Sequence, residues 1–368
     1  MNKNRKTWVA AIVILAVIFV GWRVYELREQ SSGPIKIGGA FGLTGDAAAY
    51  GEAEMNATQL AIDQVNNDGG VNGRPLKLVV EDTGSDSNKT VSAVTKLLSI
   101  DGVSGVIETW ADTFGSANPL FDQYNVVMLS PSASITGIQS GKFYKNSFST
   151  YLRSDKEMEQ LADKLAAAQK KNVAVIMEND PYWADVANRF IQQAQHDSLN
   201  IVENYQFNTG DSDFRDEWAK LKAKNPDAIL FGSDGDDATY PLLKQRNEIY
   251  PNAPLYTAEF IEEYLPKPQY AGLMHGLTYI RPQQFANQSS TFALDYQAKF
   301  GSAAPLDASN AYDAMMILAD AMIHGGLGGD AIRNYLHQNT FDTVTFGKIG
   351  FDQLGGVTET GFEMVSVK

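Results

Sequence analysis

Apolar and polar residues alternate along this chain with two different periods, which predict strands and helices in turn. Residues 35–39 form a short apolar run closed by Gly38 and Gly39, as in a buried strand. Residues 76–81 form a second apolar run. Between the two runs, apolar side chains recur every three or four positions, as on one face of a helix, at Ala53, Ala57, Leu60, Ala61 and Val65. Strand, helix and strand in this order predict a βαβ unit, and therefore a parallel sheet.

The same alternation continues and then starts afresh at residue 172. The further strands predicted before that point are 105–107 and 126–129, and those after it are 173–177, 201–205, 228–231 and 255–257. Asp180 and Pro181 suit the N-cap and first turn of a helix that carries Trp183. Because 368 residues exceed the usual size of one core, we expect two α/β lobes.

The loop at residues 41–51 is a candidate ligand site. It contains three glycines, and Tyr50 directly precedes the predicted helix. The loop follows the carboxyl end of a predicted strand, which is where open α/β sheets bind ligands.

The same segment resembles a known family. It reads GLTGDAAAYG, and the following helix ends in AIDQVNNDGGVNGRPLKLVVED. These motifs resemble the periplasmic leucine/isoleucine/valine-binding protein family, two-lobed receptors that serve ABC importers. The similarity in order and spacing runs from about Ile35 to about Glu363. It implies an α/β fold of the periplasmic-binding-protein type, in which each lobe is a parallel-sheet sandwich and three crossovers form the hinge.

The resemblance also implies lobe boundaries. We expect the first lobe to comprise residues 31–149 and about 283–343. The second lobe should comprise about 154–280 and about 348–368. The three crossovers are then expected at 148–154, 279–282 and 343–348.

The first 30 residues predict export and a membrane anchor. Residues 7–22 carry no charge and follow three basic residues, Lys3, Arg5 and Lys6. As a helix they would span roughly 24 Å of a hydrocarbon core of about 30 Å, and Val24 and Tyr25 can extend them. No A-x-A-like cleavage site follows, so we favour an anchor at residues 7–25 over a cleaved signal. Either segment places the body on the periplasmic or extracellular face of the cytoplasmic membrane.

Charge and cysteine content narrow the function classes. Residues 1–30 hold five of the 30 basic and two of the 44 acidic residues, so the remainder has 25 basic and 42 acidic residues, a net charge of about −17. Such an acidic body argues against nucleic acid as a partner. The chain has no cysteine, which excludes disulfides, thiolate metal sites and a lipid-modified cysteine.

The motifs of catalysis are also missing, so we expect no enzyme, no metal and no cofactor. The four histidines are scattered and form no H-E-x-x-H. Residues 326–331 match G-x-G-x-x-A but follow a predicted helix, whereas a dinucleotide site requires a strand there. The triplet Asp82, Thr83 and Gly84 matches that of aspartic proteases, but no second copy exists.

Several predicted strand ends carry side chains that could face one cleft between the lobes. Aromatic rings there could wall a pocket, and hydroxyls and carboxylates could bind polar groups. The candidate ligand-binding residues are Tyr50, Trp110, Asp112, Thr113, Ser132, Ala133, Ser134, Tyr182, Asp234 and Glu259.

The resemblance assigns roles to four positions. Tyr50 would line the side-chain pocket, and Tyr182 would close over the ligand. The loop SPSAS, with Ser132 and Ser134, matches an S-P-x-A-T loop that holds the ligand's carboxylate and ammonium. Glu259, in TAEF, matches an acid that pairs with the ammonium.

Asp112 and Asp234 depart from the family, which commonly has a serine and a tyrosine there. At about 4 Å and an effective dielectric near 20, Asp112 would repel a ligand carboxylate by about 4 kcal/mol, close to three decades of affinity. A one-residue slip of the alignment could give Thr113 the serine's role as hydroxyl donor to the ligand carboxylate. Alternatively, a cation could neutralise Asp112, or the ligand could be a cation or a neutral amide. Asp112 could equally be a helix N-cap, and Asp234 a solvated loop carboxylate.

The leading hypothesis is therefore an exported solute-binding protein that captures a small polar ligand, an amino acid or related amine or amide, for an ABC permease. The alternative is a membrane-anchored sensor with the same pocket and a signalling partner.

Overall fold

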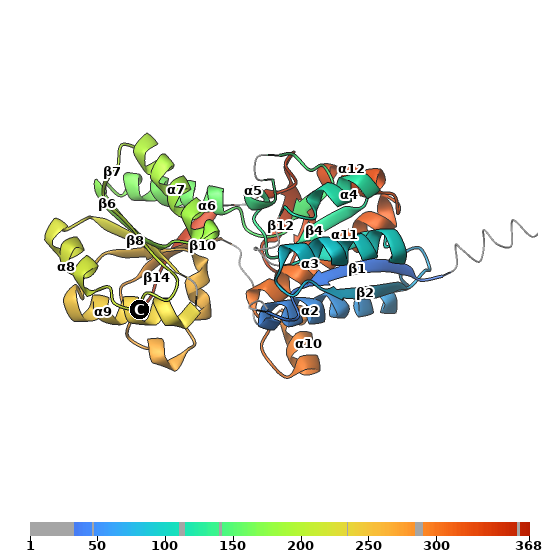
Figure 1. Ribbon diagram of the computed structural model, residues 1–368, viewed down its shortest axis with the longest axis horizontal. Coiled ribbons are helices and arrows are strands. Elements are labelled where there is room, and N and C mark those ends of the chain that lie inside the picture. The colour runs from blue at the N-terminus through green and yellow to red at the C-terminus, as the bar shows by residue number, and fades with distance from the viewer. Residues whose placement is uncertain are drawn as a thin grey trace, which may run out of the picture.

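The computed structural model describes residues 33–45, 48–109, 115–139, 142–233, 235–283, 290–358 and 361–368. They form two α/β lobes (Figure 1). The expected anchor at residues 7–25 and the candidate residues Trp110, Asp112, Thr113 and Asp234 lie outside the described ranges. Within those ranges, no helix is both long and apolar enough to cross a membrane.

The first lobe is built on a parallel five-stranded sheet of order β2-β1-β3-β4-β5. Its strands are β1 (Ile35–Phe41), β2 (Leu76–Asp82), β3 (Gly105–Glu108), β4 (Val127–Ser130) and β5 (Ser147–Ser149). The predicted βαβ unit is confirmed, since β1 and β2 pair in parallel and α2 (Ala48–Asn67) connects them.

Helices cover both faces of this sheet because successive strand residues point to opposite sides. On one face, Ile37 and Ile107 pack with α2 and with α11 (Leu306–His324). On the other face, Ala40 and Val106 pack with α3 (Ser87–Lys96), the π-helical turn η1 (Leu97–Asp101) and α4 (Asn118–Tyr124). The remaining helices of the lobe are α5 (Ile135–Ile138), α10 (Thr291–Phe300) and α12 (Gly329–Gln338).

The second lobe contains a six-stranded sheet of order β14-β10-β9-β8-β6-β7. Its strands are β6 (Asn172–Glu178), β7 (Asn200–Phe207), β8 (Ala228–Gly232), β9 (Leu255–Thr257), β10 (Thr278–Pro282) and β14 (Phe362–Ser366). All neighbours are parallel except β10 and β14. Its helical elements are α6 (Ser154–Ala167), α7 (Pro181–His196), α8 (Arg215–Lys224), α9 (Gly235–Ile249), η3 (Glu259–Glu263) and η4 (Pro268–Tyr270). The predicted two-lobed fold class is thus confirmed.

The start of α7 follows the sequence prediction. The Asp180 carboxylate accepts hydrogen bonds from the amides of Tyr182 and Trp183 at 2.7 and 3.0 Å, with Pro181 in the first turn. The Asp82 carboxylate also has a structural role, because it accepts bonds from the amides of Leu43, Thr44 and Gly84 and from the Thr44 hydroxyl.

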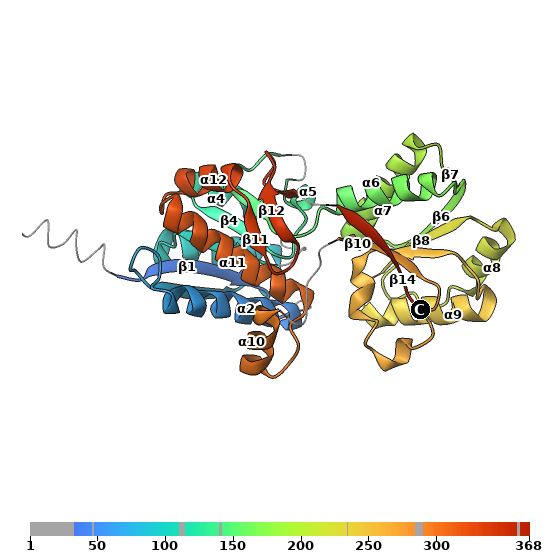
Figure 2. The ribbon, with the colours of Figure 1, turned by 180° about the vertical axis from the view of Figure 1, so that it is seen from behind.

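Among the described residues, successive elements change lobe three times: from β5 to α6, from β10 to α10, and from β13 to β14. The third crossover lies later than the expected 343–348. That segment belongs instead to a small antiparallel sheet of the first lobe, formed by β11 (Phe341–Thr343), β12 (Gly347–Phe351) and β13 (Val357–Thr358), as Figure 2 shows.

Backbone hydrogen bonding holds this small sheet to the first lobe. The Ser149 amide at the end of β5 donates to the Gly355 carbonyl at 2.9 Å. Of the described strands after α12, β14 pairs with the second lobe, whereas β11, β12 and β13 form the small sheet, which corrects the expected boundary near residue 348 to about residue 361. The apolar pattern of β12 marks a strand, but it does not say which sheet the strand joins.

A candidate ligand site between the lobes

The first lobe presents the carboxyl ends of its strands to the second lobe. Figure 1 shows β1 running from the outer end of its lobe toward the other lobe, and the strands of this sheet are parallel. The loop at 131–134 follows β4, and Glu259 follows β9 in the second lobe. Polar residues at strand ends of both lobes are therefore brought to the same region.

Tyr50 and Glu54 lie one turn apart on α2, so their side chains share a helix face. Tyr50 is half-buried, whereas Glu54 is fully buried. Burial, and next the charge of Asp307, raises the pKa of Glu54 well above its ordinary value. The hydroxyls of Ser132 and Thr109 lie against its carboxyl group and partly offset that increase.

The loop after β4 is held in place by the end of β5. The Ser149 hydroxyl donates to the Ala133 carbonyl and accepts from the Tyr151 amide. Ala133 and Ser134 are buried, and Ser132 is half-buried. The Ser132 hydroxyl lies against the Glu54 carboxyl group.

Asp307 occupies the first turn of α11 and is only partly exposed. Burial raises its pKa to about 7, with further contributions from the charges of Glu263 and Glu259. Its carboxyl group is surrounded by protein, although the residue as a whole is partly exposed. Since Glu259 and Glu263 belong to η3, the charges that act on Asp307 come from the other lobe.

Glu259, the candidate second-lobe acid, begins η3 and is 3% exposed. Burial raises its pKa, while a hydrogen bond with the Glu157 carboxyl of α6 lowers it. Ionisation of two carboxyl groups at hydrogen-bond distance is opposed by their mutual repulsion. The second lobe thus contributes a pair of buried acids.

Tyr151 connects these groups. It lies in the first crossover and is half-buried, and burial raises its pKa well above the usual range. Tyr182, Glu259 and Asp307 add to this increase, in that order. Tyr182 itself packs edge-on against Trp183, with ring centroids 5.0 Å apart. One tyrosine at the hinge is therefore close to ionisable groups of both lobes.

The structure brings together five of the ten candidate residues, Tyr50, Ser132, Ala133, Tyr182 and Glu259, around this region, with Ser134 directly beside them in the loop. The four that lie outside the described residues are Trp110, Asp112, Thr113 and Asp234.

Sequence reasoning missed Glu54, Tyr151, Glu157 and Asp307. The sequence pattern could have indicated Glu54, because it is a charged residue inside the buried stripe of α2, next to Ala53 and one turn before Thr58. No pattern could have indicated Asp307, since an acidic residue in the first turn of a helix is common.

One further buried carboxyl group, Glu108, lies at the end of β3. Burial alone raises the pKa of Glu108 to about 8, with no other ionisable group contributing. No group of three or more His, Asp or Glu side chains within the described ranges could hold a metal ion.

Comparison with known proteins gives concordant results. A family model described as "Periplasmic binding protein" matches residues 34–368. The leucine-, isoleucine-, valine-, threonine- and alanine-binding protein of Pseudomonas aeruginosa is 26% identical over 353 residues, which cover 94% of this chain and 92% of that protein.

Solved structures are similar over the same length. The branched-chain amino acid transporter substrate-binding protein LivJ of Streptococcus pneumoniae, in complex with isoleucine, has a TM-score of 0.75 at 25% identity, covering 91% of this chain and 96% of that one. An ABC transporter solute-binding protein of R. palustris, in complex with benzoate, has a TM-score of 0.74 at 16% identity, covering 91% and 94%, and shares the fold.

Proposed function

Because this chain belongs to the leucine/isoleucine/valine-binding family of periplasmic binding proteins, which bind solutes for transport and are not enzymes, we propose that it captures a small polar ligand between its lobes for ABC-type uptake. The ligand class is an amino acid or a related amine or amide, and the partner is an ABC permease. The family is exported, and we propose that residues 7–25 anchor this member to the membrane.

The observation that carries the proposal is the environment of Tyr151. Tyr182 and Glu259 of the second lobe and Asp307 of the first lobe all act on this one hinge residue. A ligand bound beside Tyr151 would therefore contact both lobes. Such a ligand binds the closed arrangement better than the open one and shifts the equilibrium toward closure.

The proposed ligand-contacting residues are Tyr50, Ser132, Ala133 and Ser134 in the first lobe and Tyr182 and Glu259 in the second. Trp110, Asp112, Thr113 and Asp234 remain proposed contacts on the sequence pattern alone. In this scheme the first lobe binds first, and Tyr182 and Glu259 complete the site on closure.

Ligand-induced stabilisation and closure test this function. The full-length protein, purified in detergent, is screened by thermal unfolding against amino acids, amides, amines, polyamines, purines and sugars. A ligand that binds only the folded state adds about 2.7 kcal/mol of stability at a hundredfold excess over its Kd. A hit should also shorten the distance between fluorophores placed on α8 and α12, in opposite lobes.

A hit without any change in that distance would contradict capture by lobe closure. Chemical conversion of the ligand during incubation would contradict a binding protein. Copurification with a permease would support transport, whereas copurification with a signalling protein would support the sensor alternative.

A further inference from the structure

Four carboxyl groups from both lobes converge near the hinge. Glu54 of α2 and Asp307 of α11 come from the first lobe, and Glu157 of α6 and Glu259 of η3 come from the second. The charge of Asp307 acts on Glu54, the charge of Glu259 acts on Asp307, and Glu157 is hydrogen-bonded to Glu259. We call these four residues the inter-lobe acidic cluster.

Three carboxylate oxygens of this cluster point to a missing partner. Glu54 is 0% exposed, and neither of its oxygens has a hydrogen bond of full geometry, although Ser132 and Thr109 lie nearby. Glu259 is 3% exposed, and its Oε2 has no partner. Buried polar groups are nearly always hydrogen-bonded, so acceptors left open on elements of both lobes suit a donor that arrives from outside.

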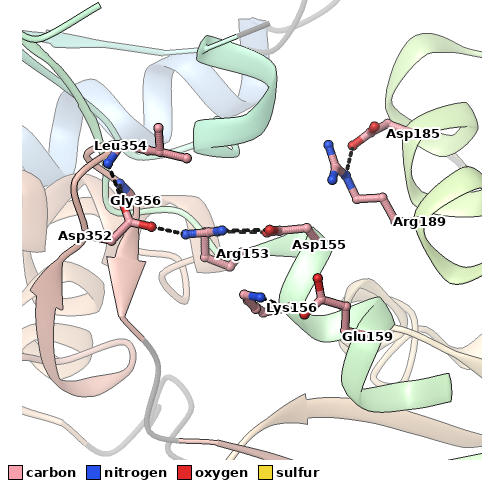
Figure 3. Close-up of polar contacts among 9 residues, drawn as sticks. All are labelled: Arg153, Asp155, Lys156, Glu159, Asp185, Arg189, Asp352, Leu354 and Gly356. Carbon is pink, nitrogen blue, oxygen red and sulfur yellow. Dashed lines mark hydrogen bonds and ion pairs between the residues drawn. The ribbon is translucent and has the colours of Figure 1, made fainter. Parts of the chain in front are cut away.

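The described part of the chain places no cation against these acids. Within the described ranges, no Lys, Arg or His pairs with Glu54, Glu259 or Asp307. The nearest cations in sequence to Glu157 are already engaged, as Figure 3 shows. Arg153 binds Asp155 and Asp352, and Lys156 binds Glu159.

We propose that the ligand is an organic cation with a net positive charge, a basic amino acid, diamine or polyamine, whose ammonium or guanidinium groups bind Glu54 and Asp307 from one lobe and Glu259 from the other. This proposal rests on the solute-binding function and specifies its ligand class. A neutral amino acid would bring a carboxylate for each ammonium, and the cluster would repel that carboxylate. Multiple N–H donors would instead satisfy the open oxygens.

The rings around the cluster fit the same ligand. Tyr50 lies one turn from Glu54, and the charges of both Tyr182 and Glu259 act on Tyr151. Tyrosine faces attract ammonium and guanidinium groups, and they add affinity when the cation is removed from water.

Binding of a cation should release protons. Glu54, Glu259 and Asp307 all have raised pKa values, and that of Asp307 is about 7. The ionisable groups that face them are Glu157 of α6, Glu262 and Glu263 of η3 and Tyr151 of the crossover. Since cation binding favours the ionised carboxylates, protons leave on binding and affinity should increase from pH 6 to pH 8.

Titration calorimetry on the full-length protein tests this inference. The cationic probes are lysine, arginine, putrescine and spermidine, and the neutral probes are leucine, isoleucine and acetamide. Each titration is run in phosphate and in Tris, whose ionisation enthalpies differ, so that proton release is measured directly. We expect a cationic probe to bind at least a hundredfold more tightly than any neutral one and to release protons.

Variants assign the effect to the cluster. Glu54→Gln and Asp307→Asn should each weaken cation binding at least tenfold and reduce the proton release. Glu217→Gln is the matched control, since Glu217 is a 3% exposed glutamate of α8 that pairs with Lys220. The Glu217→Gln variant should bind the cationic probe with the affinity of the wild type. Melting curves without ligand verify that each variant is folded.

Three results would overturn the inference. Tight binding of a neutral probe that is unaffected by Glu54→Gln would refute the cation class and leave the solute-binding function standing. Cation binding that Glu54→Gln and Glu217→Gln weaken equally would refute the cluster as the site. Failure of every probe to bind would count against both the cation class and the solute-binding function.

Discussion

The guanidinium of Arg153, in the first crossover, forms an ion pair with Asp352, which lies in the turn between β12 and β13 of the first lobe. The same guanidinium binds Asp155 at the start of α6 in the second lobe, at 2.7 and 2.8 Å (Figure 3). Asp352 is itself fixed by the amides of Leu354 and Gly356. Arg153 therefore connects the two lobes at the hinge.

Replacement of Arg153 by alanine should destabilise the protein by about 3 kcal/mol. Arg153 is 8% and Asp155 6% exposed, so the substitution leaves a buried carboxylate without its cation. Urea unfolding would measure the loss. Arg215→Ala is the control, because its partner Asp213 is exposed and such pairs contribute at most about 1 kcal/mol. Equal losses in the two variants would show that the Arg153 pairs are no stronger than surface pairs.

Stability should fall as pH rises from about 4.5 to 8, in part because of Glu108. Burial raises its pKa to about 8, so within this window the folded state keeps a proton that the unfolded state releases. Glu108→Gln should remove this contribution. The variant should be about 2–4 kcal/mol more stable than the wild type at pH 8 and nearly equal to it at pH 4.

The urea midpoints of wild type and Glu108→Gln, measured between pH 4 and pH 8, would test this prediction. Glu52→Gln is the control, because the Glu52 side chain is exposed. If the Glu108→Gln and wild-type curves run parallel, Glu108 does not retain its proton on folding.

Glu259→Gln should separate binding from stability. Burial raises the pKa of Glu259, and its Oε2 has no partner, so the neutral amide removes an unfavourable buried charge. We expect unliganded stability to be unchanged or higher and ligand affinity to fall more than tenfold. Thermal unfolding with and without the best ligand measures both quantities. An unchanged affinity would remove Glu259 from the site.

Gly51→Ala should destabilise the first lobe by about 2–3 kcal/mol. A Cβ at Gly51 would lie 2.2 Å from the Gly42 carbonyl oxygen, so α2 would have to move away from the loop after β1. Because Tyr50 and Glu54 flank Gly51, ligand affinity should fall as well. Gly328→Ala is the control, since a Cβ there meets nothing within 4 Å. Chemical unfolding of both variants would reveal whether the close approach limits this helix.

Much of the candidate site could be predicted because strand ends and helix starts have local signals. Tyr50 lies in the first turn of a periodic helix, Ser132 follows a buried strand, and Asp180 with Pro181 marks the start of α7. Glu54 was not predicted, since the charge of Asp307 acts on it from α11, a helix that lies far from α2 in the sequence. The crossover near residue 360 was misplaced for a similar reason, because β12 and β14 both have the pattern of strands.

The sequence by itself determined the order of strands and helices, the two α/β lobes and the family, because hydrophobic periodicity, caps and motif spacing involve residues close together along the chain. Only the tertiary structure decided that β12 stays with the first lobe and that Glu54, Glu157, Glu259 and Asp307 meet at the hinge. The physical reason is that sheet partnership and the burial of a carboxyl depend on which distant segments pack against it, and no local pattern encodes that choice.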